Sequence, residues 1–271
     1  MYYYRIAELC LRSECKISSF EMFLSNECKA DITIERTKEK PPAGKELVSG
    51  SIVHRDLEDG WFFHPFDYDK AGVYVSRDYT DLKILGMYGD EIYGVLEWYV
   101  RIAIECMLAR RGYVSIHASA VEIRGEAFAF TGVSGIGKST RADSWIKGLN
   151  AKLINGDRPL IDTAHGELYG VPWDGKEQCF RNVHYPLRLI CEVMRSDSVS
   201  VKEMSFEQKR NLLLSQCFIP MWDNETAAVQ MANIIMIIKN IPVIQGFSGP
   251  LPSDAAALYD AFVSLWYPVF S

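Results

Sequence analysis

The sequence lacks the features that mark nucleic-acid-binding and membrane proteins. Its 271 residues include 29 basic and 35 acidic side chains, for a formal net charge of −6, and contain no polybasic block. This balance gives no indication of affinity for nucleic acid or anionic membrane. The most hydrophobic stretch, 92–108, is interrupted by Glu97, Arg101 and Glu105 at a spacing of four residues, which is typical of a helix buried in a globular core. We therefore expect no nucleic-acid partner and no membrane partner.

Signals for secretion and for thiol-based metal binding are also missing. The first residues, Met-Tyr-Tyr-Tyr-Arg-Ile-Ala-Glu, include neither a basic segment nor a continuous apolar one, so we expect no signal peptide. No two cysteines have the C-x-x-C spacing of a zinc or redox site. Their odd number favours reduced, mostly structural thiols in a cytoplasmic protein, although the cluster between Cys10 and Cys28 could bind a ligand. The seven cysteines are Cys10, Cys15, Cys28, Cys106, Cys179, Cys191 and Cys217.

The residues that are present predict a globular chain with two regions. Its length and its 48% content of hydrophobic residues allow one core, or a small amino-terminal domain beside a larger one. Short alternating segments at 32–35, 50–54 and 72–76 are separated by turns such as Lys-Glu-Lys-Pro-Pro-Ala-Gly, and they predict a β-rich amino-terminal region over 1–88. We assign 89–271 to a second domain that opens with a helix ending at Arg111.

After Gly112 the pattern becomes that of a mixed α/β domain. Strand-like runs at 113–123 and 127–130 are joined by Arg-Gly-Glu at 124–126, a suitable hairpin turn. Further strands are expected at 151–155, 159–162, 167–171, 187–193 and 242–246. Helices are expected over 138–149 and, after the capping residues Ser205, Asn224 and Ser253, to about residues 217, 240 and 266.

The main functional motif is a glycine-rich loop. Residues 132–139 read Gly-Val-Ser-Gly-Ile-Gly-Lys-Ser and match the pattern G-x-x-x-x-G-K-[ST] of a P-loop, or Walker A motif. The three glycines let the backbone bend so that its N–H groups converge on phosphate oxygens. Lys138 supplies a mobile charge for the β and γ phosphates, and the Ser139 hydroxyl is offered to Mg²⁺. The expected nucleotide-binding residues are Gly132, Ser134, Gly135, Ile136, Gly137, Lys138, Ser139 and Thr140.

The context of the P-loop (residues 132–139) decides between two interpretations. An apolar β run at 127–131 precedes it, and Ser-Thr-Arg-Ala-Asp-Ser-Trp at 139–145 follows as a helix. A glycine-rich turn before an ordinary helix is the alternative, but the order strand, loop, helix favours phosphate binding.

Around this loop the sequence resembles a known family. The segments Ile-His-Ala-Ser at 116–119, Phe-Thr followed by the loop at 130–140, and Leu-Ile-Asn-Gly-Asp-Arg at 153–158 carry the resemblance. They resemble the catalytic domain of bacterial HPr kinase/phosphorylase, and are closer still to the stand-alone HPr-kinase-related proteins of some peptide-biosynthesis clusters. The resemblance extends over residues 112–195.

The resemblance implies a fold and an activity. The family shares its nucleotide fold with ATP-dependent phosphoenolpyruvate carboxykinase, so we expect an α/β core of mixed β-sheets with helices rather than a doubly wound sheet. It also implies ATP, Mg²⁺ and transfer of the γ-phosphoryl group to a serine hydroxyl of a peptide, protein or small molecule. HPr kinases form hexamers, but nothing in the amino-terminal region supports that state here, and a homo-oligomer is left open. The loop spacing alone predicts only nucleotide binding.

Two further residues enter through this resemblance. Asp157 follows an apolar strand and can hold Mg²⁺ together with Ser139, or accept the proton of the acceptor hydroxyl. The kinases have adjacent acidic residues here, whereas this chain has Gly156 before Asp157, so one carboxylate would combine two roles or the base lies elsewhere. His117 is expected to contact the acceptor or the γ-phosphate. A turn aspartate and a core histidine are the structural alternatives.

A Pro-Trp-x-Gly-Lys element at 172–176 resembles a segment of the kinase-related proteins. Lys176 on this loop is expected to neutralise transferring phosphate charge, with Asp174 or Glu177 as a nearby acid or base. A β-turn with a solvated lysine is the alternative. For Arg158 and Arg181 two interpretations remain: each is a phosphate ligand or a surface charge.

These residues favour a phosphotransferase, with two alternatives. One is a non-catalytic nucleotide-sensing module, which the single carboxylate at 157 supports. The other is a carboxykinase-like enzyme that acts on free metabolites.

Overall fold

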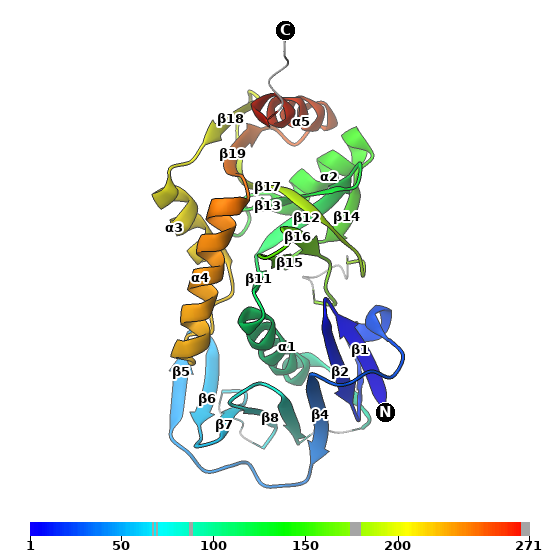
Figure 1. Ribbon diagram of the computed structural model, residues 1–271, viewed down its shortest axis with the longest axis vertical. Coiled ribbons are helices and arrows are strands. Elements are labelled where there is room, and N and C mark those ends of the chain that lie inside the picture. The colour runs from blue at the N-terminus through cyan, green and yellow to red at the C-terminus, as the bar shows by residue number, and fades with distance from the viewer. Residues whose placement is uncertain (67, 69, 87–88, 174–179, 267–271) are drawn as a thin grey trace. The chain divides into compact units, whose positions relative to one another are not determined.

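The structure of the protein is a computed structural model that describes residues 1–66, 68, 70–86, 89–173 and 180–266 (Figure 1). The chain divides into two units. The amino-terminal unit comprises Met1–Arg111 with Pro220–Val229, and the carboxyl-terminal unit comprises Gly112–Ile219 with Gln230–Ser271. The boundary expected after residue 88 therefore differs from this division, because the helix α1 (Gly94–Arg110) belongs to the amino-terminal unit.

The amino-terminal unit is built on an eight-stranded sheet in the order β1-β2-β4-β9-β8-β7-β6-β5. In β4, for example, the alternate residues Ile32 and Ile34 are buried. Alternate side chains of a strand point to the same face of the sheet, so this face is apolar. The strands are β1 (Tyr2–Ile6), β2 (Leu9–Ser13), β4 (Ile32–Thr37), β5 (Glu46–Ser49), β6 (Ile52–Asp56), β7 (Gly60–Phe63), β8 (Gly72–Ser76) and β9 (Asp81–Leu85). The strands β3 (Lys16–Ile17) and β10 (Glu91–Ile92) pair separately, and a 3₁₀ turn, η1, spans Ser18–Phe23.

Helix α1 has the narrow polar stripe that its sequence predicts. Ten of its residues are buried, including Glu105, whose carboxylate lies 3.4 Å from Nε of Arg101 one turn earlier. A buried charge is stable only when it is paired. Among the described residues, no helix combines the length and apolar character needed to cross a bilayer.

The cysteine prediction is wrong for one pair. Cys10 and Cys28 form a disulfide, with their Cα atoms 6.3 Å apart. The 18-residue separation gives no signal in the sequence, because pairing depends on how the intervening segment folds back. Disulfides are typical of oxidising compartments, so this bond gives no support to a cytoplasmic location. Cys15, Cys106, Cys191 and Cys217 are free thiols, and Cys179 lies outside the described residues.

The carboxyl-terminal unit contains a nine-stranded mixed sheet, as the predicted fold class requires. The expected hairpin joins β12 and β13 as antiparallel neighbours, while β13 and β17, and β17 and β19, are parallel pairs. The sheet follows the order β11-β15-β16-β17-β13-β12-β14, with β19 between β17 and β18. The strands are β11 (Tyr113–Ser115), β12 (Ala118–Ile123), β13 (Glu126–Thr131), β14 (Lys152–Asn155), β15 (Leu160–Asp162), β16 (Glu167–Tyr169), β17 (His184–Arg195), β18 (Ser200–Glu203) and β19 (Val243–Ser248).

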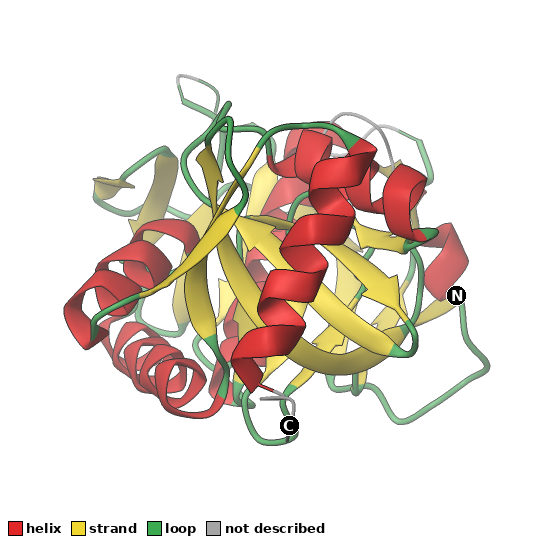
Figure 2. Cartoon of the chain, turned by 90° about the horizontal axis from the view of Figure 1, so that it is seen from above, coloured by secondary structure: helices red, strands yellow, loops and turns green. Residues whose placement is uncertain are grey.

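Helices cover both faces of this sheet (Figure 2). Phe128 and Phe130 of β13 pack with Trp145 and Phe262 of α2 (Lys138–Leu149) and α5 (Pro252–Trp266). The alternate residues Ala127 and Ala129 belong to the core that includes α3 (Phe206–Gln216) and α4 (Asn224–Asn240). A strand buried on both faces reads as a continuous apolar run, which explains the sequence Ala-Phe-Ala-Phe before the P-loop.

Helix α2 approaches α5 closely at Gly148. A Cβ atom there would lie 2.3 Å from the carbonyl oxygen of Pro252. Helix propensity alone would favour alanine by about 1 kcal/mol, but overpacking against a backbone group costs about 1–3 kcal/mol. We expect Gly148→Ala to lower the free energy of unfolding, measured in urea, by about 1–2 kcal/mol. Asp143→Ala, at an exposed position of α2, is the control and should be nearly neutral. A stabilised Gly148→Ala protein would contradict the close approach.

Candidate nucleotide-binding site

The P-loop connects β13 to α2, as its sequence predicts. Gly132 has φ of +136° and Gly137 has φ of +114°, a region that residues with a Cβ rarely adopt. Gly137 precedes the first residue of α2, and none of the described side chains caps that helix through a hydrogen bond to its first turn. The first turn also contains no acidic residue. An anion would be stabilised at the positive end of such a helix.

Lys138 is folded back on its own loop. Its Nζ donates to the carbonyl oxygens of Gly132 at 3.1 Å and Val133 at 3.5 Å. Burial lowers the pKa of this lysine, and the negative charge of Asp157 partly opposes the shift. A buried cation that is hydrogen-bonded to neutral carbonyls is stabilised further by contact with an anion. Lys138 is therefore placed to turn toward phosphate oxygens.

The structure brings His117 and Asp157 together. Nε2 of His117 lies 3.3 Å from Oδ1 of Asp157, and both side chains are about one-quarter exposed. Their backbones are also linked, since the amide of Ala118 donates to the carbonyl of Asp157 at 2.8 Å. The hydroxyl of Thr131, the last residue of β13, donates to the carbonyl of His117 at 2.8 Å. The pair is thus connected directly to the strand that carries the P-loop.

Ser119 links Ser139 of the loop to Gly156, the residue before Asp157. Its Oγ donates to the carbonyl of Gly156 at 2.9 Å and lies 3.5 Å from Oγ of Ser139. The buried hydroxyl of Ser119 therefore contacts Ser139, one of the expected metal ligands, and the residue that precedes Asp157, the other. Hydroxyl and carboxylate oxygens fit Mg²⁺, which takes one or two protein ligands together with phosphates and water. No group of three or more His, Cys, Asp or Glu that could hold a metal occurs in the part of the chain that the structure describes.

Asn155 positions the turn that carries Asp157. Its Oδ1 accepts from the amides of Asp157 at 3.0 Å and Arg158 at 2.8 Å. Its Nδ2 donates to the carbonyls of Val171 at 3.1 Å and Trp173 at 3.3 Å. The fully buried side chain thus joins the Asp157 turn to the segment that leads toward Lys176.

We expect Asn155→Ala to lower the free energy of unfolding by about 3 kcal/mol, because four backbone groups lose a buried partner. Asn155→Asp should also destabilise, since a carboxylate would replace the two donors that face carbonyl oxygens. Unfolding in urea measures both effects, and Asn211→Ala, at an exposed position of α3, serves as the matched control. A loss below about 1 kcal/mol in Asn155→Ala would show that water replaces these bonds.

The remaining candidate residues fall into three groups: those outside the described residues, Arg181 on the backbone of β14, and Arg158 near Asp157. Lys176, Asp174 and Glu177 lie outside the described residues. Arg181 donates through its side chain to the carbonyl of Leu153, so its guanidinium binds the backbone of β14. Arg158 stays near the site, with Nε 3.9 Å from Oδ2 of Asp157.

Sequence reasoning missed Arg195, at the end of β17. Its guanidinium donates to the carbonyls of Ile136 at 2.9 Å and Gly135 at 2.7 Å, both in the P-loop. Arg195 also lines a cavity of about 400 Å³ together with Thr140 and Arg141 at the start of α2. No motif surrounds Arg195, so only the pairing of β17 with β13 reveals its place.

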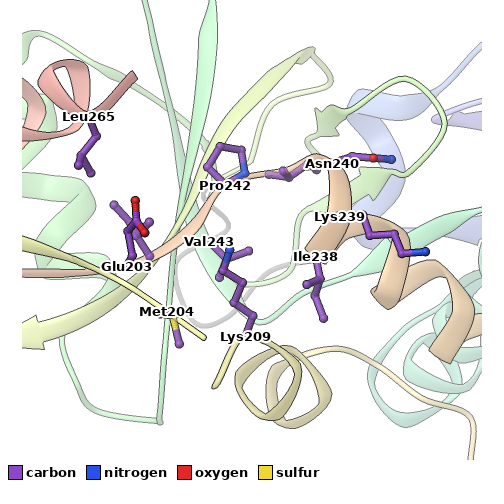
Figure 3. A pocket seen from close by; sticks show the side chains of 11 residues that line it. Glu203, Met204, Lys209, Ile238, Lys239, Asn240, Pro242, Val243 and Leu265 are labelled. Atoms are coloured by element: carbon purple, nitrogen blue, oxygen red, sulfur yellow. The ribbon is translucent and has the colours of Figure 1, made fainter. Parts of the chain in front are cut away.

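A second cavity of the carboxyl-terminal unit contains none of the predicted site residues. It measures about 320 Å³ and is lined by Lys209, Lys239, Glu203 and apolar residues around the start of β19 (Figure 3). The P-loop and the His117–Asp157 pair do not contribute to its lining.

No family model matches the sequence, and no curated protein matches it. Among solved structures, the chain is similar to the HPr(Ser) kinase/phosphatase from Coxiella burnetii, over 57% of this chain and 94% of that chain. The sequence identity is 12% and the TM-score is 0.28. We base no conclusion about fold or activity on a similarity this low.

Proposed function

We propose that the protein is an ATP- and Mg²⁺-dependent kinase that transfers the γ-phosphoryl group to a serine hydroxyl of a peptide, protein or small molecule. One observation carries the proposal. A P-loop with a buried lysine, followed by a helix start that no described side chain caps, lies beside a His–Asp pair, and Thr131 and Ser119 connect the two. Phosphate binding and proton transfer need this proximity.

Different groups of the chain bind the phosphates, the nucleoside and the metal. The P-loop amides and the start of α2 bind the β and γ phosphates, and Lys138 leaves the Gly132 carbonyl to contact them. The cavity beside Thr140 accommodates the nucleoside. When bound between Ser139 and Asp157, Mg²⁺ would neutralise part of the phosphate charge.

The transfer itself requires a proton acceptor. The serine oxygen attacks the γ-phosphorus, the bond from that phosphorus to the β,γ-bridging oxygen breaks, and ADP leaves. The hydroxyl proton passes to the Asp157 carboxylate, which His117 orients from 3.3 Å. Positioning of the hydroxyl against the γ-phosphate supplies most of the remaining acceleration.

One observation favours a different class. A single carboxylate at 157 follows Gly156, where the kinases have two adjacent acids. A nucleotide-sensing module would retain the P-loop for binding alone. Such a protein would show a large stability shift with ATP, which follows RT ln(1 + [L]/Kd), without turnover.

The test is transfer from γ-labelled ATP, with Mg²⁺ and purified protein, to components of a lysate of the source cell. A labelled species that depends on the added protein supports the kinase and delivers its acceptor for identification. ATP-dependent stabilisation without any labelled species supports the sensing module. Absence of both stabilisation and label contradicts nucleotide binding itself.

A further inference from the structure

We propose that Arg195 is a positioning residue that holds the P-loop in its phosphate-binding conformation. This inference rests on the proposed function, because nucleotide affinity is one of its two readouts. It adds a residue that no motif of the sequence includes and that lies outside the loop itself.

The parallel pairing of β13 and β17 explains how Arg195 reaches the loop. Thr131, the last residue of β13, is paired with Glu192 of β17. Strand β17 continues for three residues beyond that pair and ends at Arg195. Because the two strands run in the same direction, this extension follows the chain as it leaves β13 and enters the P-loop.

The contact of Arg195 fixes two consecutive peptide groups. The carbonyl of Gly135 shares a planar peptide with the amide of Ile136, and the carbonyl of Ile136 shares one with the amide of Gly137. In a trans peptide the C=O and N–H bonds point in opposite directions. The bonds to Arg195, at 2.7 and 2.9 Å, therefore turn both amides away from the guanidinium. The amide of Ile136 donates to the carbonyl of Val133 at 3.2 Å, which closes the turn.

Arginine has the geometry that this task needs. Its planar guanidinium presents donors in a fixed fork, so Nε and Nη2 can bind two adjacent carbonyls at once. The glycines of the loop impose little conformational preference of their own, and removing the two bonds would release the loop to many conformations. Arg195 is exposed, so its loss should leave the core of the unit unchanged.

The experiment compares Arg195→Met, Arg195→Lys and a matched control, Arg188→Met. Arg188 lies on the same strand and pairs with Glu126 at 3.1 Å. The first readout is amide hydrogen exchange of residues 132–137 in the protein without nucleotide. The second is the affinity for ATP and ADP, with KM and kcat wherever transfer is detected.

We expect faster exchange confined to the P-loop in Arg195→Met, with an unchanged melting temperature. Affinity for ATP and ADP should fall about tenfold, as expected when two charge-assisted bonds that pre-organise the site are lost. KM should rise correspondingly while kcat changes less than about threefold, because the two hydrogen bonds of Arg195 affect nucleotide binding rather than the transfer step. Arg195→Lys should restore affinity only in part, since an ammonium lacks the fork.

Two results would overturn the inference. Unchanged loop exchange in Arg195→Met would show that the loop holds its shape without Arg195. Wild-type affinity for ATP and ADP in Arg195→Lys would show that Arg195 acts only through its charge, as a direct contact with phosphate. If the wild-type protein binds no nucleotide, the proposed function fails, whereas the exchange measurement still decides the role of Arg195.

Discussion

Lys138→Ala is expected to lower phosphoryl transfer by about 10²- to 10³-fold, the range seen when one preorganised charge donor is removed from a transition state. The lysine amine lies within the loop, 3.1 Å from the Gly132 carbonyl, and is nearly buried. Among the described residues its hydrogen-bond partners are two neutral carbonyls, and its charge would be better compensated by the β and γ phosphates. Both ATP affinity and turnover should therefore fall.

Two controls separate this effect from a loss of folding. Lys138→Met keeps the aliphatic stem and should match Lys138→Ala in activity while preserving the packing of the loop. Lys147→Ala, at an exposed position in the last turn of α2, should retain full transfer. Transfer within about threefold of wild type in Lys138→Met would rule out a role for this lysine in chemistry.

Local features of this fold could be predicted because they depend on neighbours in sequence. Helix α2 spans Lys138–Leu149, as expected from the P-loop that precedes it. Ser205 and Gln208 form a reciprocal capping box at the start of α3, a pattern legible within four residues. The hairpin at 124–126 likewise follows from short-range turn chemistry, with Arg124 and Gly125 both at positive φ.

Features that depend on distant segments were not predictable. Segment 220–229 belongs to the amino-terminal unit, where Asp223 accepts from Arg110 at 3.1 Å and from Tyr79 at 2.9 Å. These partners lie 113 and 144 residues away, and no spacing rule relates them. The strand β18 (Ser200–Glu203) was not expected either, because its residues are mostly exposed and pairing with β19 alone defines it.

In the candidate site, too, the residue types could be predicted from the sequence, whereas the contacts between distant segments could not. The motif predicts Lys138 and Ser139 as site residues, and the resemblance predicts His117 and Asp157, whose side chains lie 3.3 Å apart in the structure. Ser119 and Asn155 occur within the segments that carry the resemblance, but their roles emerge only from side-chain hydrogen bonds to the turn at 156–158. Sequence patterns report residue types, whereas positioning depends on geometry.

Asp157→Asn is expected to reduce phosphoryl transfer by about 10²- to 10⁴-fold, the usual contribution of a positioned proton acceptor. Asparagine keeps the size of the side chain and can still bond to His117, so the turn held by Asn155 should stay intact. The affinity for ATP without metal should change little, because the P-loop and Lys138 bind the phosphates. Asp143→Asn, exposed on α2, is the matched control.

A metal titration of the same variant separates the two roles of the carboxylate. If Asp157 mainly holds Mg²⁺, raising the metal concentration should restore part of the lost activity in Asp157→Asn, because the weakened site can be saturated. If it mainly accepts the proton, raising the metal concentration should restore no activity. A variant with full activity at ordinary Mg²⁺ would contradict both roles. The experiment can separate metal binding from proton acceptance because Asp157 is the single acid at this place, and Gly156 cannot take over either role.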